Sequence, residues 1–130
     1  MILDRELCFL DKEALQNVES GVLGSAVDLG GSGQLDGRRA YVVIAAHDET
    51  TATGDPAMTF ALEFAEDSAF TKNLTAVPLS VPPVKKADLA AGKVVRAAAP
   101  VCAKRYARLK LTTESKLTCL NVTAGIVLDS

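Results

Sequence analysis

Aromatic residues are scarce in this sequence, which contains no Trp and only 5% aromatic residues over 130 positions. Proteins that bind single-stranded nucleic acids stack the bases on aromatic side chains, and sugar-binding modules use aromatic faces in a similar way. Two Tyr and four Phe leave few side chains for either kind of platform. Apolar residues still make up 48% of the chain and are rich in Ala and Val, which suits tightly packed sheets.

The sequence also carries almost no net charge, with a formal value of −2. Nucleic-acid affinity comes from Lys and Arg that displace counterions from the phosphates, so we expect no nucleic-acid partner. Lys104, Arg105, Arg108 and Lys110 do lie close together. Because they alternate with apolar residues, a solvated strand face is favoured over a basic patch.

Long apolar runs are absent as well. No stretch approaches the roughly 20 apolar residues of a membrane span, so we expect no membrane partner. The start, Met1 to Leu10, carries Asp4, Arg5 and Glu6 among its apolar residues. It therefore does not have the pattern of a signal peptide.

Histidine is limited to His47, which is followed by Asp48 and Glu49. Such a neighbourhood allows a general base oriented by a carboxylate. A catalytic triad also needs an activated nucleophile and an oxyanion hole, and no Gly-x-Ser-x-Gly elbow is present. We therefore interpret His47 as a polar residue where a strand meets a loop.

The three cysteines, Cys8, Cys102 and Cys119, are far apart in the sequence. Their odd number excludes a fully paired set within one chain, and no Cys-x-x-Cys spacing indicates a metal or redox site. Each lies in a strand-like apolar context, where a buried thiol is inert as a nucleophile. We expect thiols in a reducing compartment, with no intramolecular disulfide and no required metal.

The remaining motifs do not carry catalytic chemistry either. Asp48–Glu49 and Glu66–Asp67 are adjacent pairs, and adjacent strand residues point to opposite faces, whereas glycosidases need carboxylates that face each other. Asp48 to Asp55 lacks the alternating ligands of a calcium loop, which favours a solvated turn. Gly30 to Gly33 is not followed by Gly-Lys-Ser/Thr and opens no helix. We expect no enzyme activity and no cofactor.

Period two dominates the apolar pattern. It predicts strands over Met58 to Ala65, Tyr106 to Thr112 and Leu120 to Leu128, because side chains alternate across a pleated sheet. In the last of these, Leu120, Val122, Ala124, Ile126 and Leu128 form the predicted apolar face. The predicted core contains Ile44, Phe60, Leu62, Phe64, Leu109, Leu111, Val122, Ile126 and Leu128.

Weaker patterns predict further strands at Val22 to Leu29, Ala40 to His47 and Lys93 to Ala98. Ala40 to His47 is nearly all apolar and is expected at the centre of a sheet. Leu74 to Val81 is expected at an edge, because Pro78 cannot donate a hydrogen bond to a ladder.

Two segments carry a helical signal. Asp88 to Gly92 predicts one helical turn, capped by Asp88 and ended by Gly92. Asp11 to Ser20 fits two helical turns as well as an extended N-terminal arm. With about eight short strands and no crossover helices, the sequence predicts one all-β domain over residues 1–130, an antiparallel sandwich or barrel.

Six stretches, taken in order, carry a resemblance to a known family. They are Met1 to Leu7, Val27 to Gly30, Glu63 to Phe70, Ala87 to Gly92, Lys104 to Leu109 and Val122 to Asp129. Along nearly its whole length the chain resembles the small capsid cement, or decoration, proteins of tailed bacteriophages and prophages. The resemblance implies an antiparallel jelly-roll β-sandwich without catalysis or cofactor.

It also implies a place on the outer surface of a virion capsid, after synthesis in the cytoplasm of the bacterial host. The implied partners are the major capsid protein of a phage and further copies of the chain. A homodimer is favoured because two-fold contacts are commonest, and a trimer is the alternative. Unpaired strand edges are the expected contact, at Ile2 to Leu10 or Leu120 to Leu128.

Two other functions stay open at this point. A carbohydrate- or receptor-binding β-sandwich of a phage tail or virion surface would need exposed aromatic residues. A small jelly-roll enzyme would need a cluster of histidines to hold a metal, and the chain has only His47.

Overall fold

The computed structural model describes residues 8–28, 39–79, 83–99 and 104–129. These residues form nine strands and one short 3-10 helix. The strands are β1 Cys8–Val18, β2 Gly21–Asp28, β3 Arg39–Ala46, β4 Thr51–Ala52, β5 Met58–Ala65, β6 Thr75–Pro78, β7 Val94–Ala98, β8 Tyr106–Thr113 and β9 Leu117–Asp129, and the helix η2 is Lys86–Leu89. The predictions for residues 1–7, for the Gly30 to Gly33 loop and for Cys102 fall outside the described residues.

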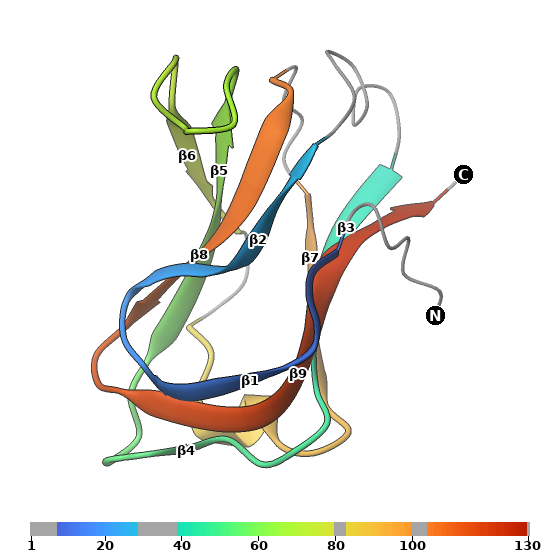
Figure 1. Ribbon diagram of the computed structural model, residues 1–130. Helices are drawn as coiled ribbons and strands as arrows, with labels where there is room; N and C mark the ends of the chain where they lie inside the picture. Colours follow the sequence, from blue (N-terminus) through green and yellow to red (C-terminus); the bar gives the residue numbers. More distant parts are fainter. Residues whose placement is uncertain (1–7, 29–38, 80–82, 100–103, 130) are drawn as a thin grey trace.

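The strands form two antiparallel sheets that face each other (Figure 1). One sheet has the order β1-β9-β3-β7, with β4 paired to β9, and the other has the order β2-β8-β5-β6. The pairs are nested along the chain: β1 with β9, β2 with β8, β3 with β7, and β5 with β6. A long hairpin rolled up in this way is a jelly roll, so the predicted fold class is confirmed.

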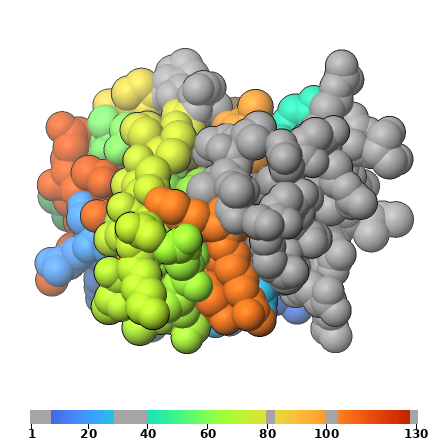
Figure 2. Space-filling model, turned by 90° about the horizontal axis from the view of Figure 1, so that it is seen from above, coloured from blue at the N-terminus to red at the C-terminus, as the bar shows by residue number. Residues whose placement is uncertain are grey.

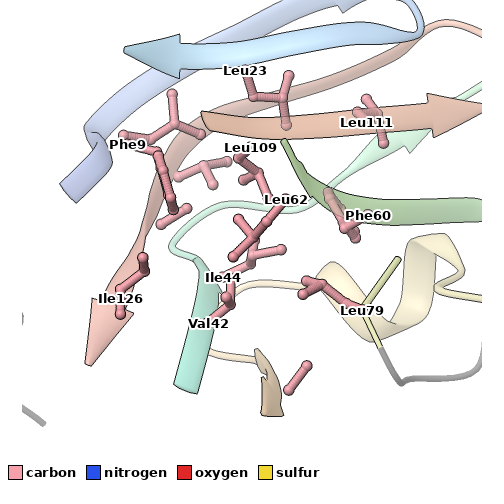
Figure 3. Packing of buried hydrophobic residues seen from close by; sticks show 14 of the residues in the cluster. Phe9, Leu23, Val42, Ile44, Phe60, Leu62, Leu79, Leu109, Leu111 and Ile126 are labelled. Carbon is pink, nitrogen blue, oxygen red and sulfur yellow. The ribbon is translucent and has the colours of Figure 1, made fainter. Parts of the chain in front are cut away.

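The period-two pattern places the core between the sheets, as Figure 3 shows. On β8, Ala107, Leu109 and Leu111 are at most 1% exposed, while Arg108 and Lys110 point outward. Each fully buried Leu or Phe contributes roughly 1.5–3 kcal/mol by leaving water. The predicted core residues are buried as expected, apart from Leu128, whose side chain is not described: Ile44, Phe60, Leu62, Phe64, Leu109, Leu111, Val122 and Ile126.

The alternation of β9 shifts by one residue in the middle of the strand. Leu117 and Cys119 point inward and are buried, and Val122 is the next residue that does so. Leu120, which the alternation placed on the apolar face, is 56% exposed, so that prediction is wrong. The reason is a change of partner, because β9 pairs with β4 up to Thr118 and with β3 from Val122 onward.

The ambiguous segment Asp11 to Ser20 is extended and not helical, because β1 runs from Cys8 to Val18 along β9. The strand is irregular. Lys12 and Asn17 have positive φ values of 49° and 51°, and the register along β9 shifts repeatedly. At both bends a threonine hydroxyl of β9, Thr123 or Thr118, accepts the backbone N–H hydrogen bond. At these two positions, threonine hydroxyl groups thus replace backbone carbonyl groups as acceptors between β1 and β9.

The helical turn predicted at Asp88 to Gly92 exists, but it begins two residues earlier in the chain than predicted. The 3-10 helix spans Lys86–Leu89, and Asp88 is its third residue and not its cap. The Asp88 carboxylate still satisfies the helix start, because it accepts a hydrogen bond from the backbone N–H of Lys85 at 3.0 Å. Leu89 anchors the turn in the core at 6% exposure.

Candidate assembly surface

Within the described residues, the strand orders end at β1 and β7 on one sheet and at β2 and β6 on the other. The two-residue β4 is a further edge, because it pairs with β9 alone. The closing strand β9, predicted as an edge available for self-association, is not one. It pairs with β1 on one side and with β3 and β4 on the other. Because both sides of β9 already pair with other strands, a second copy cannot add a strand to it. The prediction that Leu120 to Leu128 forms a free edge is wrong.

The edges of β1 and β2 close on each other. Gly24 of β2 has φ +67°, and a Cβ at this position would lie 2.0 Å from the carbonyl oxygen of Phe9. The register between β2 and β8 shifts between Leu23 and Val27. Phe9 and Leu10, in the stretch Ile2 to Leu10 that was predicted as an edge contact, are 2% and 1% exposed and belong to the core.

The edges of β6 and β7 are simpler. As predicted, β6 is an edge strand, and it contains Pro78 within its four residues. β7 pairs with β3 residue by residue, from Tyr41↔Ala98 to Ala45↔Val94, without a register shift. The predicted central position of Ala40 to His47 is confirmed, because β3 lies between β9 and β7.

The outer face of the β2-β8-β5-β6 sheet carries a buried carboxylate. Glu63 lies on this outer face but is only 5% exposed. Its Oε1 accepts a hydrogen bond from Arg108 Nε at 2.7 Å, and its Oε2 lies 3.8 Å from Lys110 Nζ. The Arg108 guanidinium lies 4.2 Å from the ring centroid of Phe70, which holds the ion pair under the loop of residues 66–74.

The other two cations of the basic run are also held in place. Arg105 forms a two-pronged pair with Asp28, from Nε to Oδ1 at 2.9 Å and from Nη2 to Oδ2 at 2.8 Å. The hydrogen bonds and the charge of Asp28 raise the pKa of Arg105. Lys104 donates to the Asn73 carbonyl and to the Thr75 hydroxyl. The four basic residues therefore form an ordered strand face, and each of them is held by an oxygen atom of a neighbouring residue.

The loop of residues 66–74 beside this face is shaped by Asp67. Its carboxylate accepts hydrogen bonds from the Thr71 hydroxyl at 2.5 Å and from the backbone N–H groups of Thr71 and Lys72 at 2.9 Å. These bonds, first that of the Thr71 hydroxyl, lower the pKa of Asp67. Phe70, at φ +58°, turns its ring under Arg108 and is 6% exposed.

Two of the stretches that carry the family resemblance, Glu63 to Phe70 and Lys104 to Leu109, are neighbours here. Glu63 pairs with Arg108 and Ala65 with Tyr106 between β5 and β8. Figure 2 shows the yellow-green loop of residues 66–74 beside the orange start of β8 on the upper end of the molecule. We call this cluster the Arg108 surface; it comprises Glu63, Phe70, Lys104, Arg105, Tyr106 and Arg108.

His47, Cys8 and Cys119, the described residues considered for catalysis, have separate hydrogen-bond partners. The ring Nε2 of His47 lies 2.9 Å from the hydroxyl of Thr123, and that hydroxyl also accepts a hydrogen bond from the backbone N–H of Lys12. Cys119 is 1% exposed, and its thiol donates to the Asp48 carbonyl at 3.3 Å. The Cys8 thiol lies 2.9 Å from the Leu10 carbonyl oxygen.

The acidic segment Asp48 to Asp55 lines an open groove of about 580 Å³ beside the 3-10 helix. Glu49 and Asp55 contribute carboxylates to it, and Lys86 contributes the opposite charge. Over the described ranges, no three His, Cys, Asp or Glu side chains gather as a metal ion would require. No helix in the same ranges is long and apolar enough to cross a membrane.

Comparison with known proteins gives one family. The family model described as Bbp16 matches residues 16–126. No curated protein matches the chain. Among solved structures, the chain is similar to the CBM22-1-GH10 modules of the Clostridium thermocellum endo-1,4-beta-D-xylanase 10B, complexed with xylohexaose, at 18% identity and a TM-score of 0.42. The alignment covers 98% of this chain and 28% of that chain, and the likeness is too distant to bear on function.

Proposed function

This chain belongs to the Bbp16 family, and we propose that it is a structural capsid cement protein. In this role it binds the outer surface of a phage or prophage capsid and stabilises contacts between neighbouring capsomers. The major capsid protein and further copies of the chain are the proposed partners. The observation that carries the proposal is the Arg108 surface, where two stretches of the cement-protein resemblance form one ordered face.

Order in this face favours binding to a large partner. Association costs roughly 0.5–1.5 kcal/mol for each long side chain that becomes immobilised. Arg105 and Arg108 are already held, by Asp28 and by Glu63 with Phe70. Arg and Tyr residues are also the side chains most often found at the centre of protein interfaces.

Stabilisation of the shell follows from mass action. A protein that binds only the assembled shell, across a boundary between capsomers, lowers the free energy of that state and not of the separated subunits. A rigid sandwich that contacts two neighbouring capsomers holds them together, and this role requires no chemical reaction.

The aromatic side chains are poorly placed for sugar stacking. Phe9, Phe60 and Phe64 are in the core. The guanidinium groups of Arg96, Arg105 and Arg108 lie 4.0, 5.1 and 4.2 Å from the ring centroids of Tyr41, Tyr106 and Phe70. Of the competing functions, a carbohydrate-binding module therefore receives little support from these residues.

The test uses purified shells of the phage or prophage that encodes the chain, stripped of this protein. Adding the full-length protein should restore their resistance to heat and salt, measured by light scattering. The variant Arg105→Glu should bind shells at least tenfold more weakly. The matched control is Lys116→Glu, at an exposed cation that pairs with Glu19. Lys116 follows the end of β8, whereas Arg105 precedes its start.

Lys116→Glu should bind shells like the unmodified protein. If stripped and decorated shells survive heating equally well, or if the protein does not bind shells at all, the cement function is wrong. If both variants bind like the original, the function stands and the Arg108 surface is not the contact.

A further inference from the structure

The strand β7 leaves one row of backbone groups without a partner strand in the part of the chain that the structure describes. At its two ends, the Ala46 N–H donates to the Lys93 carbonyl at 3.1 Å and the Ala99 N–H to the Ala40 carbonyl at 2.8 Å. In an antiparallel pair every second residue bonds to the same neighbour. The N–H and C=O groups of residues 94, 96 and 98 therefore point away from β3.

β4 has only two residues, and the edges of β1, β2 and β6 each carry a feature that hinders pairing with another chain. β1 bends at two residues with positive φ, Lys12 and Asn17. β2 contains a register shift and Gly24 at positive φ. β6 is short and contains Pro78, whose position faces away from β5. β7 has none of these features: its register is regular, and no residue in it is Pro or has positive φ.

The side chains of β7 are compatible with a neighbouring strand. Val94 is 49% exposed and Ala98 is small and exposed. The charge of Arg96 is turned over the sheet, because its guanidinium lies 4.0 Å from the Tyr41 ring centroid. The edge is thus left with apolar and small side chains, and burial of Val94 would be favourable.

We propose that β7 pairs antiparallel with β7 of a second copy of the chain, across a two-fold axis. The axis passes beside Val95, so that Val95 faces Val95 of the second copy and Arg96 faces Val94. This register avoids two arginines directly opposite each other, which would repel. The pairing joins two five-stranded sheets into one. It deepens the cement function, on which it rests, by assigning the surface of self-association.

The test is a pair of proline variants of the full-length protein. Val94→Pro removes an N–H that points away from β3 and that meets Arg96 of the second copy in the proposed register. It should leave the fold intact, since proline is tolerated at the first residue of an edge strand. The matched control is Ala76→Pro on β6. Leu79 N–H donates to Phe60 O in β5, so residues 75 and 77 also bond to β5. Ala76 lies between them and is exposed, and its N–H therefore points away from β5.

Sedimentation and light scattering over a range of concentrations give the outcome. The original protein and Ala76→Pro should dimerise equally, and Val94→Pro should dimerise at least tenfold more weakly, with unchanged circular dichroism. Equal dimerisation of all three overturns the proposal, and so does an original protein that stays monomeric. Shell protection is measured separately, so a monomer that still protects shells overturns the β7 contact and leaves the cement function standing.

A cysteine variant tests the register without proline. Facing residues of a non-hydrogen-bonded pair have Cα atoms about 4.5 Å apart, which suits a disulfide. Oxidised Val95→Cys should give a covalent dimer well above the background of the original protein, and Val94→Cys should not. Absence of the Val95→Cys cross-link overturns the proposed axis.

Discussion

Two ion pairs on the outer face of the four-stranded sheet differ in their contact with water. The Glu63 side chain is 7% exposed, whereas those of Asp28 and Arg105 are 45% and 52% exposed. Replacing Glu63 with Ala leaves Arg108 partly buried without its carboxylate. We expect a loss of about 2 kcal/mol in the free energy of unfolding.

Asp28→Ala is the control for this change, because water screens an exposed pair. Its free energy of unfolding should stay close to that of the original protein. Urea denaturation of both variants makes the comparison. A larger loss for Asp28→Ala than for Glu63→Ala would contradict the assignment of Glu63 as the buried partner.

Gly24 is the residue for which the backbone leaves least room. Its φ of +67° strains any residue with a Cβ, and that Cβ would lie 2.0 Å from the Phe9 carbonyl oxygen. Gly24→Ala should destabilise the protein by about 3 kcal/mol or more. Gly54, also at positive φ but with nothing within 4 Å of its Cβ position, is the matched control. Thermal melts should show a much smaller loss for Gly54→Ala.

The Asp67 carboxylate gives the loop of residues 66–74 a defined pH dependence. Its pKa is lowered, first by the Thr71 hydroxyl, so it stabilises the folded state above its unfolded pKa. That contribution is lost as the pH falls through the lower, folded value. Thr71→Val should raise the pKa of Asp67 toward its ordinary value, which an NMR titration of the carboxyl carbon measures. An unchanged titration would show that this hydroxyl is not the main cause.

At the scale of the element, β9 offers two leucines in one strand with opposite environments. Leu117 is 3% exposed and Leu120 is 56% exposed. Leu117→Ala should cost about 2–4 kcal/mol, because it leaves a cavity in the core. Leu120→Ala should change the free energy of unfolding by less than about 0.5 kcal/mol. Equal losses in urea denaturation would mean that the strand keeps its alternation through residue 120.

The strand β1 also limits what a truncation can report. Removing Met1 to Leu10 would separate self-association from folding only if this stretch lay outside the core. With Phe9 and Leu10 at 2% and 1% exposure, the cut removes core side chains. Such a variant would lose stability first, so substitutions on β7 are the sharper probe of association.

At the scale of the whole molecule, the nested pairing determines how the chain folds. The first strand pairs with the last, as in Cys8↔Gly125 and Val18↔Leu117, so much of the sheet joins residues about a hundred positions apart. Proteins dominated by such distant pairings fold in about milliseconds to seconds. We expect stopped-flow refolding from urea to fall in this range. Refolding in microseconds would contradict the nested topology.

The sequence by itself determined the elements whose alternation is regular. β8 alternates along its length and β5 does so from Met58 to Leu62, so Phe60, Leu62, Leu109 and Leu111 were assignable to the core. Pro78 marked an edge strand for a reason of local chemistry, the missing N–H. The single histidine and the odd number of cysteines were likewise visible in composition alone.

Only the tertiary structure decided the features that depend on which strands meet. Leu120 turns outward because β9 exchanges one partner for another, and Glu63 is buried because β8 brings Arg108 against it. The segment Asp11 to Ser20 is a strand because β9 supplies its hydrogen bonds, although its own pattern fits a helix equally well. The same holds for β7: its five residues predict a strand, but its open edge exists only because β3 pairs with one side of it. Pairing between distant segments is a property of the folded chain, and no local pattern contains it.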